Sequence, residues 1–143
     1  MAYSTTSDIL KRIRKPDYDK LTLVYAGDGL TSEGIKDEAI ATADSIIDSY
    51  LQKRIADLPL DAPPKSIVQA SCDIAIYNLH SRIQYIDIPE WVSVRYNAVM
   101  SWLKDISKGI AEIETGGLAE AETESGGIDY ENERDSLFTS STF

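Results

Sequence analysis

The spacing of apolar positions predicts a central helix over residues 65–82. Apolar residues recur there at helical intervals and also spread around most of the cylinder, which is typical of a helix with neighbours on several sides. The set comprises Ile67, Val68, Ala70, Cys72, Ile74, Ala75, Ile76 and Leu79. Pro63 and Pro64 stand directly before it, where a missing backbone N–H costs nothing. Burying each large side chain of this helix contributes roughly 1.5–3 kcal/mol before entropy is subtracted.

Two further long helices are predicted on either side of it. The first begins at Ser32, with Glu33 near its positive end, and ends before Pro59. Its apolar stripe consists of Ala39, Ile40, Ala43, Ile47, Tyr50, Leu51 and Ile55. The second has Asp87 as its N-cap and ends at Gly109. Its apolar residues are Trp91, Val92, Tyr96, Val99, Met100, Leu103 and Ile106.

The N-terminal region predicts one short helix and a long connection. Thr5 or Thr6 caps the helix, with Asp8 completing a T-x-x-D pattern, and Pro16 ends it. In the following connection, over residues 17–31, the apolar residues Leu21, Leu23, Val24 and Tyr25 are expected to pack against the core. The predicted fold class is therefore mostly α, a small bundle of about four helices. Its expected core residues are Ile47, Leu51, Ile67, Ile74, Leu79, Val99 and Leu103.

The character of the chain changes after Gly109, so we divide it into a helical body, 1–109, and an acidic, Gly-rich C-terminal arm, 110–143. The arm could contain short β pieces, because the IAEIE stretch at its start alternates apolar and acidic residues. Its last residues include three apolar side chains, Leu137, Phe138 and Phe143. A docking arm, a tail without a partner and a segment folded back on its own domain all agree with this pattern.

Composition and charge narrow the classes of function. A chain of 143 residues with 43% hydrophobic and 27% charged residues is typical of one soluble domain. No apolar run is long enough to span a membrane, and the first seven residues do not resemble a signal peptide, so we expect assembly in a cytoplasm. Residues 1–108 carry a net charge of −2 and residues 109–143 one of −8. This balance argues against wrapping nucleic acid. The cluster Lys11, Arg12, Arg14 and Lys15 is interpreted as a solvated helix face.

Candidate catalytic chemistry is sparse. The single Cys72 and the single His80 do not form a zinc-binding set, and we expect a buried thiol and a hydrogen-bonding imidazole instead. No nucleophile elbow, P-loop or dinucleotide motif is present, and AGDGLTSEG lacks EF-hand spacing. We therefore expect no enzyme, no catalytic residue, no metal and no cofactor.

Four stretches taken together resemble a known family. They are YSTTSDIL, ATADSIIDSYLQKRI followed by LPL, SIVQASCDIAIYNLH and PEWVSVRYNAVMSWLKDISKG, which together span residues 3–109. In order and spacing they are similar to small helical proteins of Mu-like prophages, grouped with the head–tail connectors (neck adaptor or head-completion proteins) of tailed bacteriophages. The Asp- and Gly-rich loop that such proteins often carry before the second helix is reduced here to AGDG, so no ion binding is carried over.

The resemblance implies a structural protein of the virion neck, assembled in the host cytoplasm. Such proteins form a ring, commonly of about twelve copies, whose closure requires a heterologous interface. The implied partners are the portal protein, copies of the chain itself and another neck or tail-completion protein. DNA would pass through the ring without specific binding, and no membrane is involved. Leu137, Phe138 and Phe143 would dock the arm on the portal or on a neighbour. Two alternatives remain: a tail-side completion or terminator protein, and a small cytoplasmic helical interaction protein that forms no ring.

Overall fold

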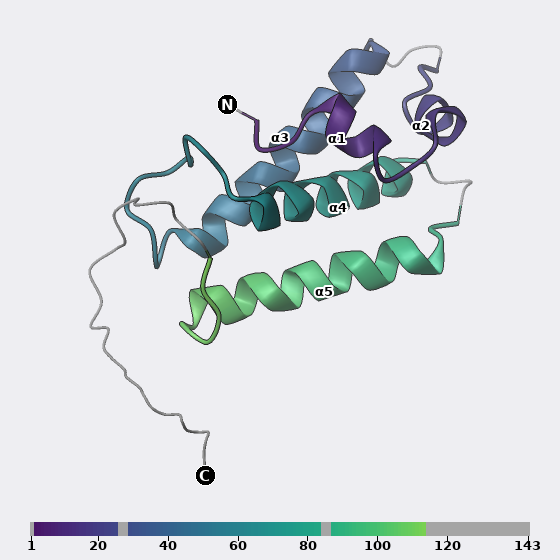
Figure 1. Ribbon diagram of the computed structural model, residues 1–143. Coiled ribbons are helices and arrows are strands. Elements are labelled where there is room, and N and C mark those ends of the chain that lie inside the picture. The colour runs from purple at the N-terminus through teal and green to yellow at the C-terminus, as the bar shows by residue number, and fades with distance from the viewer. Residues whose placement is uncertain (1, 26–28, 84–86, 114–143) are drawn as a thin grey trace.

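Five α-helices make up the part of the chain that the computed structural model describes, residues 2–25, 29–83 and 87–113 (Figure 1). In chain order they are α1 (Thr6–Leu10), α2 (Lys15–Leu21), α3 (Ser32–Leu51), α4 (Lys65–Ser81) and α5 (Glu90–Ser107). None of the described residues lies in a β-strand. The mostly α fold class is confirmed, with one helix more than the apolar pattern predicted.

The central position of α4 follows from its all-round apolar surface. It contacts α1, α3 and α5, and it lies between the two other long helices (Figure 1). Ten of its 17 residues are buried. The expected core residues with no exposed surface are Ile47, Leu51, Ile67, Ile74, Leu79 and Leu103. Val99 differs, because it is only partly buried where a groove opens between α4 and α5.

The N-terminal region forms two short helices, so the predicted single helix ending at Pro16 was wrong. α1 has the expected capping box between Thr5 and Asp8 and ends at Leu10. Pro16 lies in the first turn of α2, where its missing N–H is harmless and its fixed φ suits a helix start. The same residue type is compatible with both roles, and the sequence pattern alone favoured the wrong one.

The connection after α2 also departs from expectation. Leu21 is 2% exposed, but Leu23, Val24 and Tyr25 are 50%, 42% and 46% exposed. Leu21 and Tyr18 already fill the core at this end of the bundle. The backbone beyond them is held instead by Arg82, which donates hydrogen bonds to the carbonyls of Leu21 and Leu23 at 3.0 and 3.4 Å.

The two outer long helices begin and end by different means. α3 is capped by Thr31, whose hydroxyl accepts a hydrogen bond from the N–H of Gly34 at 2.9 Å, and it ends at Leu51, so Ile55 is buried in the turn beyond it. α5 follows Pro89, and Asp87 does not cap it, because the side chain lies two residues too early to reach the first turn.

Gly109 directly follows the C-cap of α5 and stops the helix, as predicted. Its φ of 81° is a left-handed conformation that favours glycine, and a Cβ there would collide with the guanidinium of Arg54. Beyond it, Ala111 and Ile113 pack against the core and Ile110 is 72% exposed, without forming a strand. None of the described helices has the length and apolar character needed to cross a membrane.

Candidate functional site

A buried polar network attaches the N-terminal segment to the helical bundle. The N–H of Tyr3 donates to Asp44 Oδ2 at 2.8 Å, and the Tyr3 hydroxyl donates to Asp48 Oδ1 on the next turn of α3. The same hydroxyl accepts the N–H of Leu60 at 2.9 Å. Burial, together with the hydrogen bond to Asp48, raises the pKa of Tyr3 well above its ordinary value. One tyrosine therefore joins the N-terminal segment, α3 and the connection before α4.

Asp44 extends this network to α4. Its Oδ1 accepts a hydrogen bond from the Ser71 hydroxyl at 2.7 Å, and Ser71 is hydrogen-bonded to Ser4 at 2.7 Å. Burial raises the pKa of the Asp44 carboxyl, while the hydrogen bonds from Ser71 and Tyr3 act in the opposite direction. All four residues are buried and mutually satisfied, which makes this network a structural one.

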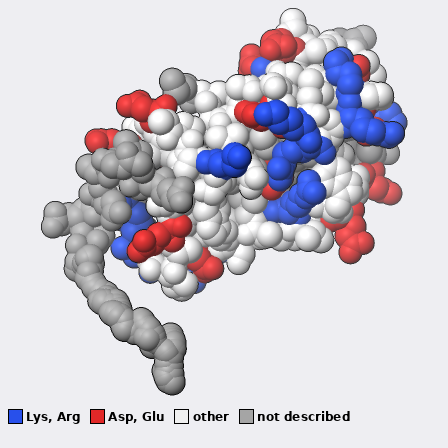
Figure 2. Space-filling model, viewed as in Figure 1, with Lys and Arg blue, Asp and Glu red and all other residues white. Residues whose placement is uncertain are grey.

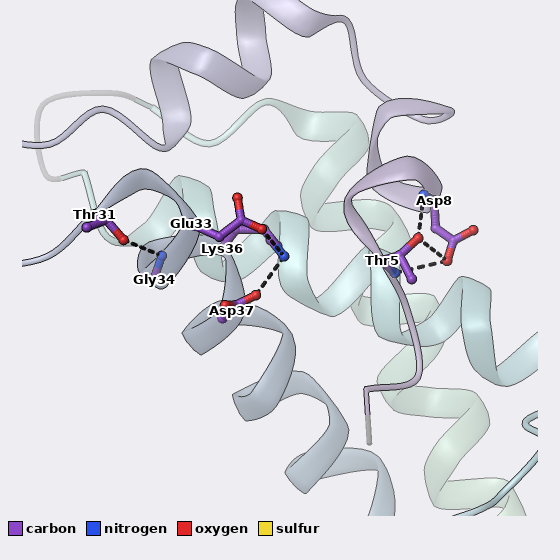
Figure 3. Close-up of polar contacts among 7 residues, drawn as sticks. All are labelled: Thr5, Asp8, Thr31, Glu33, Gly34, Lys36 and Asp37. Carbon is purple, nitrogen blue, oxygen red and sulfur yellow. Dashed lines mark hydrogen bonds and ion pairs between the residues drawn. The ribbon is translucent and has the colours of Figure 1, made fainter.

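An open groove lies between this N-terminal segment and α3. It has a volume of about 780 Å³, and Asp37, Asp44 and Asp48 are among the residues that line it. Lys36 also lies there and pairs with Glu33 at 2.9 Å and Asp37 at 2.6 Å (Figure 3). Burial disfavours the charged lysine, but the hydrogen bonds to Asp37 and Glu33 outweigh that cost and raise its pKa.

Figure 3 also shows that the Thr5–Asp8 capping box of α1 and the Thr31–Gly34 cap of α3 flank this polar region. These contacts pair backbone N–H groups at the starts of the two helices, so they do not leave those groups free to bind a ligand in the groove. Within residues 2–25, 29–83 and 87–113, no three His, Cys, Asp or Glu side chains are grouped so that they could hold a metal ion.

α5 presents a long face that the rest of the described chain leaves uncovered. Only Val92, Leu103 and Ile106 of its 18 residues are buried. Trp91, one of the apolar residues predicted for this helix, is 40% exposed, and Val94 is 57% exposed. The guanidinium of Arg95 lies 5.0 Å from the centre of the Trp91 ring. Exposed apolar side chains on one helix face are a common feature of protein–protein contacts.

A groove of about 270 Å³ runs beside this face, between α4 and α5. We call it the α4–α5 groove; it is lined by Ser66, Gln69, Ala70 and Asp73 of α4 and by Arg95, Ala98, Val99 and Trp102 of α5. Asp73 is also paired with Arg12 at 3.1 Å, so the N-terminal region contributes to the edge of the groove. Figure 2 shows Lys and Arg side chains gathered over the α1 and α4 region of this face.

The predicted residues fall into distinct places. Cys72 is buried, and burial raises the pKa of its thiol to about 11. His80 is buried with its Nδ1 3.0 Å from the Ile76 carbonyl oxygen, as expected of a hydrogen-bonding residue. Leu137, Phe138 and Phe143 lie outside the described residues.

Sequence reasoning missed the Asp44 network. A signal was available, because Asp44 and Ser71 are polar residues inside the apolar patterns of α3 and α4. A polar residue at such a position needs a partner, but the partners of Asp44 include Tyr3, which is 41 positions away in the chain. The pattern could therefore indicate that a partner exists without indicating which residue supplies it.

Comparison with known proteins places the chain among phage sequences. A family model described as "Bacteriophage Mu, Gp36" matches residues 3–131. The chain is also similar to gene product J of Escherichia phage Mu, with 28% identity over 109 residues. That alignment covers 76% of this chain and 74% of the phage protein.

Proposed function

Since the chain belongs to the bacteriophage Mu Gp36 family, we propose that it is a structural protein of the virion that connects head and tail. In this proposal it forms a homo-oligomeric ring between the portal protein and the next neck or tail component. The ring extends the channel through which DNA passes. The protein is assembled into particles in the host cytoplasm and acts without catalytic chemistry or a cofactor.

The observation that carries the proposal is the uncovered face of α5. An 18-residue helix with three buried residues and an exposed Trp91 has more apolar surface than its own bundle uses. In a closed ring, each subunit presents one surface to one neighbour and a different surface to the other. The uncovered face of α5 supplies one of these two surfaces in our proposal.

The negative charge on the outer face of α3 supports a position of this helix beside the DNA channel. Its exposed residues include Glu33, Asp37 and Glu38 in the first turns, followed by small residues such as Ala41 and Ser45. Carboxylates facing the channel would repel the phosphates of the passing genome and prevent it from adhering. In our proposal α3 therefore faces the lumen, while α5 faces a neighbouring copy.

Removing the gene from the phage or prophage that encodes it tests this function. We expect DNA-filled heads and complete tails that do not join, as seen by electron microscopy of lysates. Adding the purified full-length protein to the lysate should restore joining. Joined, infectious particles without the protein would refute the proposal.

A binding experiment separates the connector from a tail-side protein. The tagged full-length chain is incubated with purified portal rings and, in parallel, with tail-tube protein. Retention by the portal supports a connector, and retention by the tail tube alone would assign the chain to tail completion instead. A heat-unfolded sample of the chain provides the control for nonspecific capture.

A further inference from the structure

The α4–α5 groove has the dimensions of a site for a side chain. It exists because Ala70 and Ala98 are too small to fill the space between the two helices, while Val99 and Trp102 form apolar walls. Its volume of about 270 Å³ exceeds the ~150 Å³ that holds a benzene ring in a protein interior. The volume is below the ~300–1,000 Å³ of typical small-molecule pockets. An aromatic side chain therefore fits this groove better than a free ligand does.

The charge around the groove favours an acidic occupant. Arg95 lines the groove and has no carboxylate partner among the described residues. Arg12 approaches from the other side through its ion pair with Asp73. The exposed residues Lys11 and Arg14 stand on either side of Arg12 in the chain, and Figure 2 shows Lys and Arg side chains over the region of α1 and α4.

The C-terminal segment of the chain has the matching composition. Residues 114–135 contain eight acidic side chains and one basic side chain. The last eight residues, SLFTSSTF, are uncharged and include Leu137, Phe138 and Phe143. The order is thus an acidic stretch followed by an aromatic end, which corresponds to a basic surface beside an apolar groove.

The length of the segment favours the groove of another copy over the chain's own groove. Trp102 lies only about 8 Å along the axis from the last residue of α5, at ~1.5 Å per residue. A few residues would return the chain to its own groove, but Phe138 is 25 positions beyond Ile113. When it is fully extended, that stretch spans up to ~80 Å, which is about six times the ~13 Å radius of gyration of a domain of this size.

We propose that the α4–α5 groove of each subunit binds the C-terminal segment of a neighbouring copy, with Phe138 seated between Ala98 and Trp102. The acidic stretch before it then lies near Arg95 on the α5 side of the groove and Arg12 on the α4 side. This inference rests on the proposed ring, because it needs copies held side by side. Each subunit both gives and receives a segment, so the contact is heterologous and can close a ring.

Disulfide trapping tests the assignment in the full-length chain. Ala98 is exposed, so Ala98→Cys should fold normally, and Thr139→Cys places the second thiol on the segment next to an intact Phe138. Under mild oxidation two thiols lose two electrons and two protons to the oxidant and form one S–S bond. Native Cys72 is 1% exposed and does not compete. The double variant should give a ladder of dimers, trimers and higher oligomers on a non-reducing gel, which collapses on reduction.

The matched control moves the receiving cysteine to α3. Ser49 is exposed on that helix, so Ser49→Cys with Thr139→Cys has the same thiol count at a site outside the groove. It should give no ladder. An equal ladder from this control, or a purely intramolecular disulfide in the Ala98→Cys variant, would overturn the inference.

The trapping is done both on concentrated purified protein and on particles assembled from the double-variant gene. Absence of intermolecular links in both preparations would also overturn the docking assignment. If heads and tails join normally without such links, docking fails while the connector function stands. If purified protein gives the ladder but joining does not depend on the chain, the connector function fails while docking stands.

Discussion

Replacing Asp44 by Ala should destabilise the fold more than any surface substitution. The change removes the acceptor for the Tyr3 N–H at 2.8 Å and for the Ser71 hydroxyl at 2.7 Å. Hydrogen bonds to a charged acceptor are worth about 1.5–3 kcal/mol each, and the cost of burying the carboxylate offsets part of that gain. Ser71 retains Ser4 as a partner, whereas the buried N–H of Tyr3 loses the acceptor that Asp44 gives it. We expect a net loss of about 2–4 kcal/mol in the free energy of unfolding.

Urea unfolding of the full-length variants, followed by far-ultraviolet circular dichroism, measures this loss. Ser45→Ala is the control, because Ser45 is the next residue on α3 but is exposed, and it should change stability by no more than about 0.5 kcal/mol. Asp44→Asn retains one acceptor oxygen, so its loss of stability should lie between the losses caused by Asp44→Ala and Ser45→Ala. An Asp44→Ala loss similar to that of Ser45→Ala would refute the structural role of the network.

The same group predicts a pH dependence of stability. Burial raises the pKa of Asp44 in the folded chain above its ordinary value of 3.8, so the folded state keeps its proton where the unfolded state has lost it. The contribution of Asp44 to stability therefore decreases as pH rises from 3.8 through the raised pKa. The stability difference between the wild-type chain and Asp44→Asn should fall across that window and become constant above it. A difference that rises with pH would contradict the direction of the shift.

Three further changes test the body and the arm. Ile74→Asp places an unpaired charge at a position with no exposed surface, which costs several kcal/mol, so the helical circular dichroism signal should be lost; a normal spectrum would contradict the central role of α4. Gly109→Ala forces a Cβ onto a backbone of φ 81° and against Arg54, so stability should fall by about 1–2 kcal/mol, and an unchanged melting temperature would contradict this. Deleting residues 136–143 should leave a folded helical body that no longer enters particles, and normal incorporation of the truncated chain would show that this end is not the docking element.

The long helices could be predicted from sequence because their signals are local. The apolar stripes of α3 and α4 recur at the helical period, and Gly109 marks the end of the α5 region through its own backbone preference. The short segments were harder, because their signals have two meanings. Pro16 is compatible with the end of one helix and with the start of another, and only the surrounding structure decides between them.

The candidate surfaces could be predicted only in part, for a related reason. Periodicity identifies which side of α5 is apolar, but it does not distinguish residues that fill the core from residues left for a partner. Trp91 and Leu103 therefore both belong to the apolar set predicted for this helix, although one is 40% exposed and the other has no exposed surface. The α4–α5 groove is lined by one alanine from each helix, Ala70 and Ala98, and no local pattern indicates that these two residues share a site.

The buried network and the groove are connected through α4. Ser71 faces the Asp44 network, and Asp73, two positions later, reaches the groove and pairs with Arg12. The N-terminal segment is thus fixed at one end by Tyr3 and at the other by Arg12, so that it cannot shift without breaking a buried contact. A surface that receives a flexible chain gains affinity when its own residues are already ordered, because less entropy is lost on binding. The position of the N-terminal segment across α3 and α4 therefore gives the basic edge of the groove a rigidity that favours the proposed capture of an acidic segment.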